Sequence, residues 1–101
     1  MKDLFTSSSF VLIISHQGPD GDSIGSSVAL ARYLKKLSVK SHIIFPDPFP
    51  SYYGWLLEEE DFTVANLDSE KLPSLFNMAD LICCLDFNLS LIHISEPTRQ
   101  V

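Results

Sequence analysis

Two uninterrupted apolar runs constrain the fold of this chain more than any other feature. Residues Phe10 to Ser15 and Leu81 to Phe87 are each continuous stretches of β-prone side chains. Such runs are typical of strands buried on both faces of a parallel sheet, because strands with one wet face alternate apolar and polar residues. Shorter strands are predicted at Ser41 to Phe45 and at Thr63 to Asn66.

An apolar stripe at helical spacing predicts a helix over Ser23 to Leu37. The members of the stripe are Ile24, Val28, Ala31 and Leu34 or Leu37. Asp22 or Ser23 can cap the start of this helix. Basic side chains suit its carboxyl end, where the helix dipole is negative. These are Lys35, Lys36 and Lys40.

A second helix is predicted over Ser69 to Met78. The order strand, helix, strand, helix, strand then implies an α/β fold, a parallel sheet with flanking helices and right-handed crossovers. Tyr52 to Glu59 reads as a short helix or an aromatic-rich loop. Its Trp55 and Leu56 are expected to cover the sheet, while Glu58 to Asp61 are expected to face water.

Composition limits the classes of function. The chain has 101 residues, 46% of them apolar, which suits one globular domain with a small core. Its formal net charge of −6 does not attract phosphate groups, so any phosphate chemistry needs bound cations. Cys83 and Cys84 are adjacent in an apolar run, which argues against a mutual disulfide and for a reducing compartment. Because neither a membrane span nor a good signal peptide is evident, we expect a cytoplasmic protein.

A histidine and several carboxylates follow the two long runs. His16, Asp20 and Asp22 come directly after the first, and Asp86 ends the last. Because ligands of open α/β sheets sit beyond the carboxyl ends of the strands, these side chains are expected at one sheet edge. They would repel one another there unless a cation lies between them. A mixed nitrogen and oxygen ligand set suits Mn²⁺, Fe²⁺ or Zn²⁺.

The plain alternative is a Pro-Asp-Gly turn followed by a helix cap, since these residues are standard in turns. Other site motifs fail on spacing. A calcium loop starting at Asp20 would need an oxygen ligand at Ile24 and a glutamate at Ala31. The sequence contains neither a Walker phosphate loop nor a dinucleotide-binding glycine pattern, and no serine stands on a tight strand–helix elbow.

Two stretches resemble motifs of one enzyme family. HQGPDGDSIGSS, His16 to Ser27, is similar to the first motif of the DHH family of phosphoesterases. ADLICCLDFN, Ala79 to Asn88, is similar to its second motif, including an aspartate at a strand end. Element order agrees over residues 10 to 88, and the nearest pattern is that of the bifunctional oligoribonucleases (nanoRNases) that are also pAp phosphatases. The resemblance implies that residues 1–88 are the N-terminal part of a DHH phosphoesterase domain.

The resemblance also implies a centre of two metal ions, usually manganese. By it, His16 and Asp20 hold one ion and Asp22 holds the second. Asp86 bridges the two, so Asp22 and Asp86 are the expected catalytic carboxylates. Two ions lower the pKa of a shared water, which becomes the nucleophile, and clamp the phosphate under attack.

Weaker candidates for phosphate binding are Ser23, Gly25 and Ser26, at the start of the predicted helix. Short RNA oligonucleotides or small phosphorylated nucleotides such as pAp are the expected substrates, and the full-length protein is a candidate homodimer. A family II inorganic pyrophosphatase and a cyclic-dinucleotide phosphodiesterase are the alternative enzymes. The alternative of another class is a non-catalytic fragment that binds metal or nucleotide.

The last residues have a second resemblance. Leu89 to Arg99 agree with the translation, in one frame, of a transposase-type sequencing adapter. We therefore expect residues 89–101 to be an artefactual tail, the alternative being an edge strand over Leu89 to Ile94. His93 is then not a metal ligand. The Asp-His-His motif and the smaller C-terminal domain of the family do not occur in these 101 residues, so one complete metal site at most and little turnover are expected of this chain.

Overall fold

A computed structural model describes most of the chain. The described residues are 5–15, 21–48, 51–65, 67, 69–85 and 89–93, with only the backbone described for 21–23, 51–53 and 89–93. Their elements are β1 (Phe10–Ile14), α2 (Gly21–Lys36), β2 (Lys40–Phe45), the 3-10 helix η1 (Ser51–Leu57), β3 (Phe62–Val64), the 3-10 helix η2 (Ser69–Lys71), α3 (Leu72–Met78), β4 (Leu81–Leu85) and β5 (Leu89–His93). The predicted α/β architecture is confirmed.

Five strands form one sheet in the order β3-β2-β1-β4-β5. The first four are mutually parallel, as predicted from the apolar runs. β5 pairs antiparallel with β4, with Leu89 opposite Leu85. It is the edge strand that the sequence offered as the alternative for this segment. Such pairing uses backbone groups only, and it is therefore independent of the origin of the segment.

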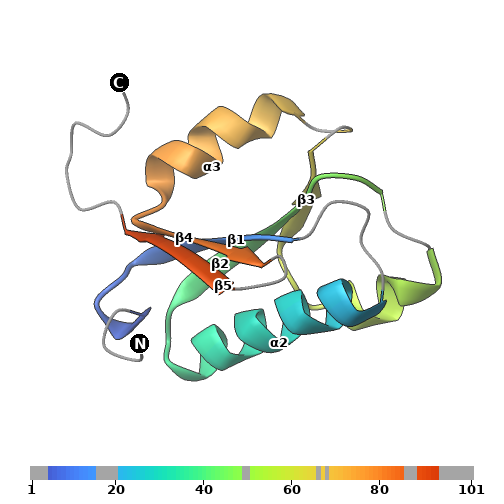
Figure 1. Cartoon of the computed structure of the whole chain (residues 1–101), viewed down its shortest axis with the longest axis horizontal. Helices are drawn as coiled ribbons and strands as arrows, with labels where there is room; N and C mark the ends of the chain where they lie inside the picture. Colours follow the sequence, from blue (N-terminus) through green and yellow to red (C-terminus); the bar gives the residue numbers. More distant parts are fainter. Residues whose placement is uncertain are drawn as a thin grey trace.

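Helices cover both faces of the sheet, with α2 on one side and α3 on the other (Figure 1). Residues alternate between the faces along each strand. Val11 and Ile13 of β1 belong to the larger core cluster, which packs against α2, while Leu12 belongs to the smaller one, against α3. The predicted helical stripe is buried. Its members Ile24, Val28, Ala31 and Leu34 are between 0% and 5% exposed.

Four sequence expectations are wrong. Asp22 and Ser23 do not cap α2 but lie inside its first turn, because the helix already begins at Gly21. Lys40 does not belong to the end of α2 but begins β2, because the chain reverses at Ser38, whose φ is 62°. Trp55 does not cover the sheet, since it is 68% exposed, whereas Leu56 packs against the core as expected and Leu57 is buried. Glu60 does not face water, because its side chain is only 8% exposed and is paired with Arg32 at 3.2 Å.

Other expectations hold. Pro73 lies in the first turn of α3, the position that tolerates its missing N–H. Cys83 and Cys84 are free thiols on opposite faces of β4, where burial raises the pKa of Cys83 to about 12. No helix of the described residues is long and apolar enough to cross a bilayer.

Candidate functional site at the carboxyl ends of β1 and β4

The strand order changes direction at β1. From β1 the chain moves outward through β2 to β3, and it then returns to the other side of β1 with β4. The connections on the two sides pass over opposite faces, α2 below and α3 above in Figure 1. In an open α/β sheet this arrangement leaves a crevice between the two central strands, at their carboxyl ends. The fold therefore directs ligands to the ends of β1 and β4.

β1 and β4 end side by side. Their register places Ile14 opposite Cys84, and beyond it the Ser15 N–H donates to the carbonyl oxygen of Ile44 on β2 at 2.9 Å. In the sequence, His16 follows Ser15 directly, and Asp86 follows the last residue of β4. The two segments predicted to hold metal therefore start from neighbouring strands, although about 70 residues separate them.

Several predicted ligands lie outside the described residues, namely His16, Asp20 and Asp86. Asp22 and Ser23 belong to the first turn of α2, and their side chains also lie outside the described part. Among the side chains that are described, no group of three His, Cys, Asp or Glu residues is arranged to hold a metal. The individual metal contacts of these residues thus remain predictions.

The first turns of α2 are described from Ile24 onward. A Cβ built on Gly25 meets no atom within 4 Å, so packing inside this chain does not require the glycine, and space remains for another group. Ser26 is exposed, whereas Ser27 is fully buried against the sheet. Gly25 and Ser26 are therefore accessible for the predicted phosphate binding, and Ser27 is a packing residue.

A buried hydroxyl lies at the same end of β1. Ser15 is 3% exposed, and its Oγ has no hydrogen-bond partner among the described residues. Leaving such a group unpaired costs about 1–3 kcal/mol, and sequence reasoning did not single it out. An orphaned polar atom beside the crevice is the structural observation that fits a polar or metal-binding centre at this edge.

The opposite ends of the same strands are tied together by Asp80. Its carboxylate accepts hydrogen bonds from the Ser9 N–H at 2.8 Å, the Ser9 hydroxyl at 3.2 Å and the Phe10 N–H at 3.1 Å. Partial burial opposes ionisation of Asp80, but these donors outweigh it and lower its pKa. Asp80 belongs to the second motif by sequence, and its role here is to fix β1 against β4.

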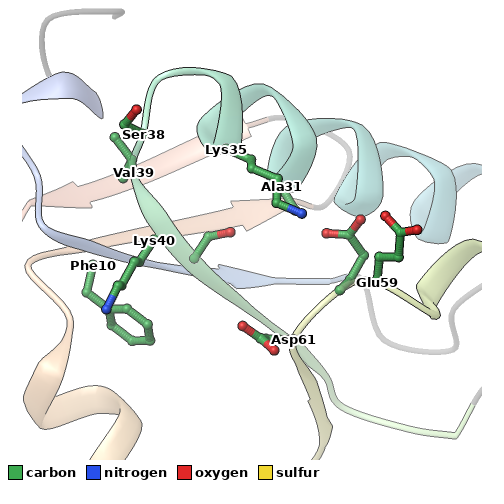
Figure 2. A pocket seen from close by; sticks show the side chains of 10 residues that line it. Phe10, Ala31, Lys35, Ser38, Val39, Lys40, Glu59 and Asp61 are labelled. Carbon is green, nitrogen blue, oxygen red and sulfur yellow. The ribbon is translucent and has the colours of Figure 1, made fainter.

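A hollow of about 480 Å³ lies elsewhere, at the amino ends of β1 and β2. Figure 2 shows the basic residues Lys35 and Lys40 and the acidic residues Glu59 and Asp61 around it. Charges of both signs line it, so it has no preference for an anion such as phosphate. Strand topology favours the opposite ends of these strands, their carboxyl ends. We therefore place the candidate site there rather than in this hollow.

His42 is a structural residue, as expected. Its Nε2 lies 2.7 Å from the Thr63 hydroxyl oxygen, across β2 and β3. Desolvation is the largest influence and lowers the pKa of His42; the nearby Asp61 opposes this effect, and Lys71 adds to it. The neutral ring is thus favoured, in a position remote from the carboxyl ends of the strands.

Comparisons with known proteins agree with this fold. The sequence model of the DHH family, N-terminal domain, matches residues 10–100. Among solved structures, the chain is similar to an exopolyphosphatase-related protein from Bacteroides fragilis, with 36% sequence identity and a TM-score of 0.76. The match covers 86% of this chain and 26% of that one. The search of curated proteins found no match.

Proposed function

Since this chain belongs to the DHH family, we propose that it is part of a metal-dependent phosphoesterase. The observation that supports this most directly is the side-by-side ending of β1 and β4, from which the two family motifs continue in the sequence. A solved protein with the same arrangement is described as exopolyphosphatase-related. The chain spans about a quarter of that protein, so the activity proposed here is that of a longer protein.

We propose His16, Asp20, Asp22 and Asp86 as the ligands that this chain contributes to a centre of two Mn²⁺ ions in the longer protein. Bound ions would supply an activated water and positive charge against the phosphate. The chain's own contribution is then to hold its carboxylates close together at one sheet edge despite their mutual repulsion. Its net charge of −6 is consistent with this, because without bound cations the chain would repel a phosphate ester. With fewer ligands than the family uses, this 101-residue chain is proposed to bind one ion and to turn over little substrate.

Short oligoribonucleotides and pAp-type nucleotides are our proposed substrates, on the similarity of the first motif to the nanoRNase pattern. Inorganic polyphosphate is the second candidate, because the structural neighbour is described as exopolyphosphatase-related. Pyrophosphate and cyclic dinucleotides remain alternatives from the motif itself. All share a phosphoryl centre flanked by oxygen, so the same metal chemistry serves each. The residues that choose among them are not assigned.

Calorimetric titration of the purified chain with Mn²⁺ tests the metal site. Wild type is expected to bind with measurable heat, and Asp20→Asn is expected to weaken binding strongly, because a neutral amide is a poorer ligand than a carboxylate. Asp61→Asn is the matched control, since Asp61 is exposed and lies near the amino end of β3. Equal affinity in Asp20→Asn and wild type would remove the metal interpretation of the motif.

Phosphate release in the presence of Mn²⁺, from pAp and from polyphosphate in parallel, tests the rest of the proposal. Little or no release is expected from this chain. Turnover that is lost in Asp86→Asn would show instead that the chain contains a complete site. Turnover of polyphosphate without pAp would transfer the substrate proposal to the second candidate.

A further inference from the structure

The position of Ser15 is unusual for a polar residue. The register of β1 with β2 and β4 places it level with Phe45 on one side and Leu85 on the other. Phe45 is fully buried in the cluster beneath α2, and Leu85 packs against the same cluster. Because side chains alternate along a strand, Ser15 lies on this face with Val11 and Ile13. It is a hydroxyl in an otherwise apolar row.

Packing alone does not explain the hydroxyl. An alanine would occupy the same row without an unpaired polar atom, and buried polar groups nearly always have a partner. The Ser15 N–H donates to the carbonyl oxygen of Ile44 at 2.9 Å, which anchors the Ser15 backbone beside β2. Its Oγ has no partner among the described residues, which suggests that the partner belongs to the functional centre.

The neighbouring sequence supplies candidates of the right chemistry. Ser15 immediately precedes His16, and its neighbour Leu85 immediately precedes Asp86. Asp22 is in the first turn of α2, the helix that covers this face. Carboxylates that bind metal are themselves held by hydrogen bonds from surrounding groups, and these outer partners set the orientation of the ligand. A serine hydroxyl can donate one such bond.

We infer that Ser15 is a positioning residue, whose buried hydroxyl donates a hydrogen bond to a carboxylate ligand of the metal centre at the ends of β1 and β4. This inference rests on the proposed function, because it requires a metal centre at that edge. The Oγ of Ser15 is buried away from solvent, so the role proposed is to hold a ligand rather than to contact the substrate. It acts by fixing the orientation of the carboxylate.

Three variants test the inference by Mn²⁺ calorimetry and by thermal unfolding without metal. Ser15→Ala is expected to weaken Mn²⁺ binding by about 10- to 100-fold, the usual effect of losing an outer-shell partner. Without metal, the same variant is expected to unfold at the same or a higher temperature, because it removes an unpaired polar atom from the core. A merely structural serine would not give these two effects together.

Ser15→Thr and Ser15→Val form a matched pair of equal shape, with and without the hydroxyl. Thr is expected to retain most of the Mn²⁺ affinity and Val to lose it. If Thr and Val weaken binding equally, or if all three variants bind like wild type, Ser15 is a packing residue and the metal site stands without it. If wild-type protein fails to bind Mn²⁺, the proposed metal centre fails and the role of Ser15 fails with it.

Discussion

At the scale of single residues, His42 shows how a half-buried polar side chain is made compatible with the sheet. Its ring contacts the Thr63 hydroxyl at 2.7 Å, so one ring nitrogen is paired without a charge. Protonation would bring a cation into a partly desolvated position, with Asp61 in partial compensation and Lys71 in opposition. The pKa of His42 therefore lies below its ordinary value of 6.5.

The stability of the protein should depend on pH through this residue. A histidine whose pKa is lowered on folding binds its proton more readily when unfolded, so its contribution is complete above pH 6.5 and is lost as the pH falls towards the folded pKa. Urea unfolding between about pH 7.5 and 5.5 should show a falling free energy of unfolding in wild type, with a smaller slope in His42→Gln. Equal slopes in the two proteins would contradict the assignment.

At the scale of elements, the pairing of β1 with β4 is reinforced at its start by a side chain. Asp80 precedes β4 and accepts from Ser9 and Phe10 at the start of β1, while its own N–H donates to the Phe10 carbonyl at 3.1 Å. These bonds lie at the amino ends of the two strands. Because Asp80 fixes the register of β1 and β4 at their amino ends, it also fixes which residues lie opposite one another at their carboxyl ends. The candidate site lies at those carboxyl ends.

Replacement of Asp80 should destabilise this pairing. Asp80→Asn replaces a charged acceptor of several donors with a neutral amide, and the expected loss is about 1–3 kcal/mol in the free energy of unfolding. Because the pKa of Asp80 is lowered, its contribution is present above the ordinary value of 3.8 and is lost as the pH falls through the lower folded value. Chemical denaturation at neutral pH, with the exposed Glu58→Gln as control, measures the difference. A loss no larger than that of the control would contradict this role.

The elements were predictable where the apolar residues form a continuous run, as in a buried strand, or a stripe at helical spacing. β1, α2, β2 and β4 each follow an apolar run or stripe, and the structure confirms them within a few residues. Expectations for Trp55 and Glu60 failed because tertiary contacts decided them: Arg32 reaches across from α2 to pair with Glu60. No local pattern predicts such a pair, since 28 residues separate the partners.

The meeting of β1 and β4 at their carboxyl ends was predictable for a different reason. Strand order and the rule for open α/β sheets bring the ends of the first and fourth strands together, whatever side chains follow. Ser15 was not predictable as a site residue, because a serine ending an apolar run reads as part of the strand. Its importance depends on being level with Phe45 and Leu85, and only the register shows that.

At the scale of the whole molecule, residues 89–101 are the part whose origin matters most. We propose that they derive from adapter DNA, because Leu89 to Arg99 agree with its translation. Amplification of the source DNA outward from the codons for Asp80 to Asn88, followed by sequencing, is then expected to reveal an open frame that leads to an Asp-His-His motif. Genomic DNA that encodes Leu89 to Val101 would contradict this and would make β5 a natural edge strand.

The central place of β1 has a consequence for synthesis. β1 is synthesised before its partner strands, and one of its two hydrogen-bonding edges is satisfied only by β4, about 70 residues later. At about 5–20 residues per second, that edge waits on the order of 4–14 s for its partner. During this interval the apolar strand of Phe, Val, Leu and Ile is exposed on the nascent chain to contact with other chains. Until β4 has been synthesised, that edge of β1 is open to pairing with other strands, and aggregation can compete with folding.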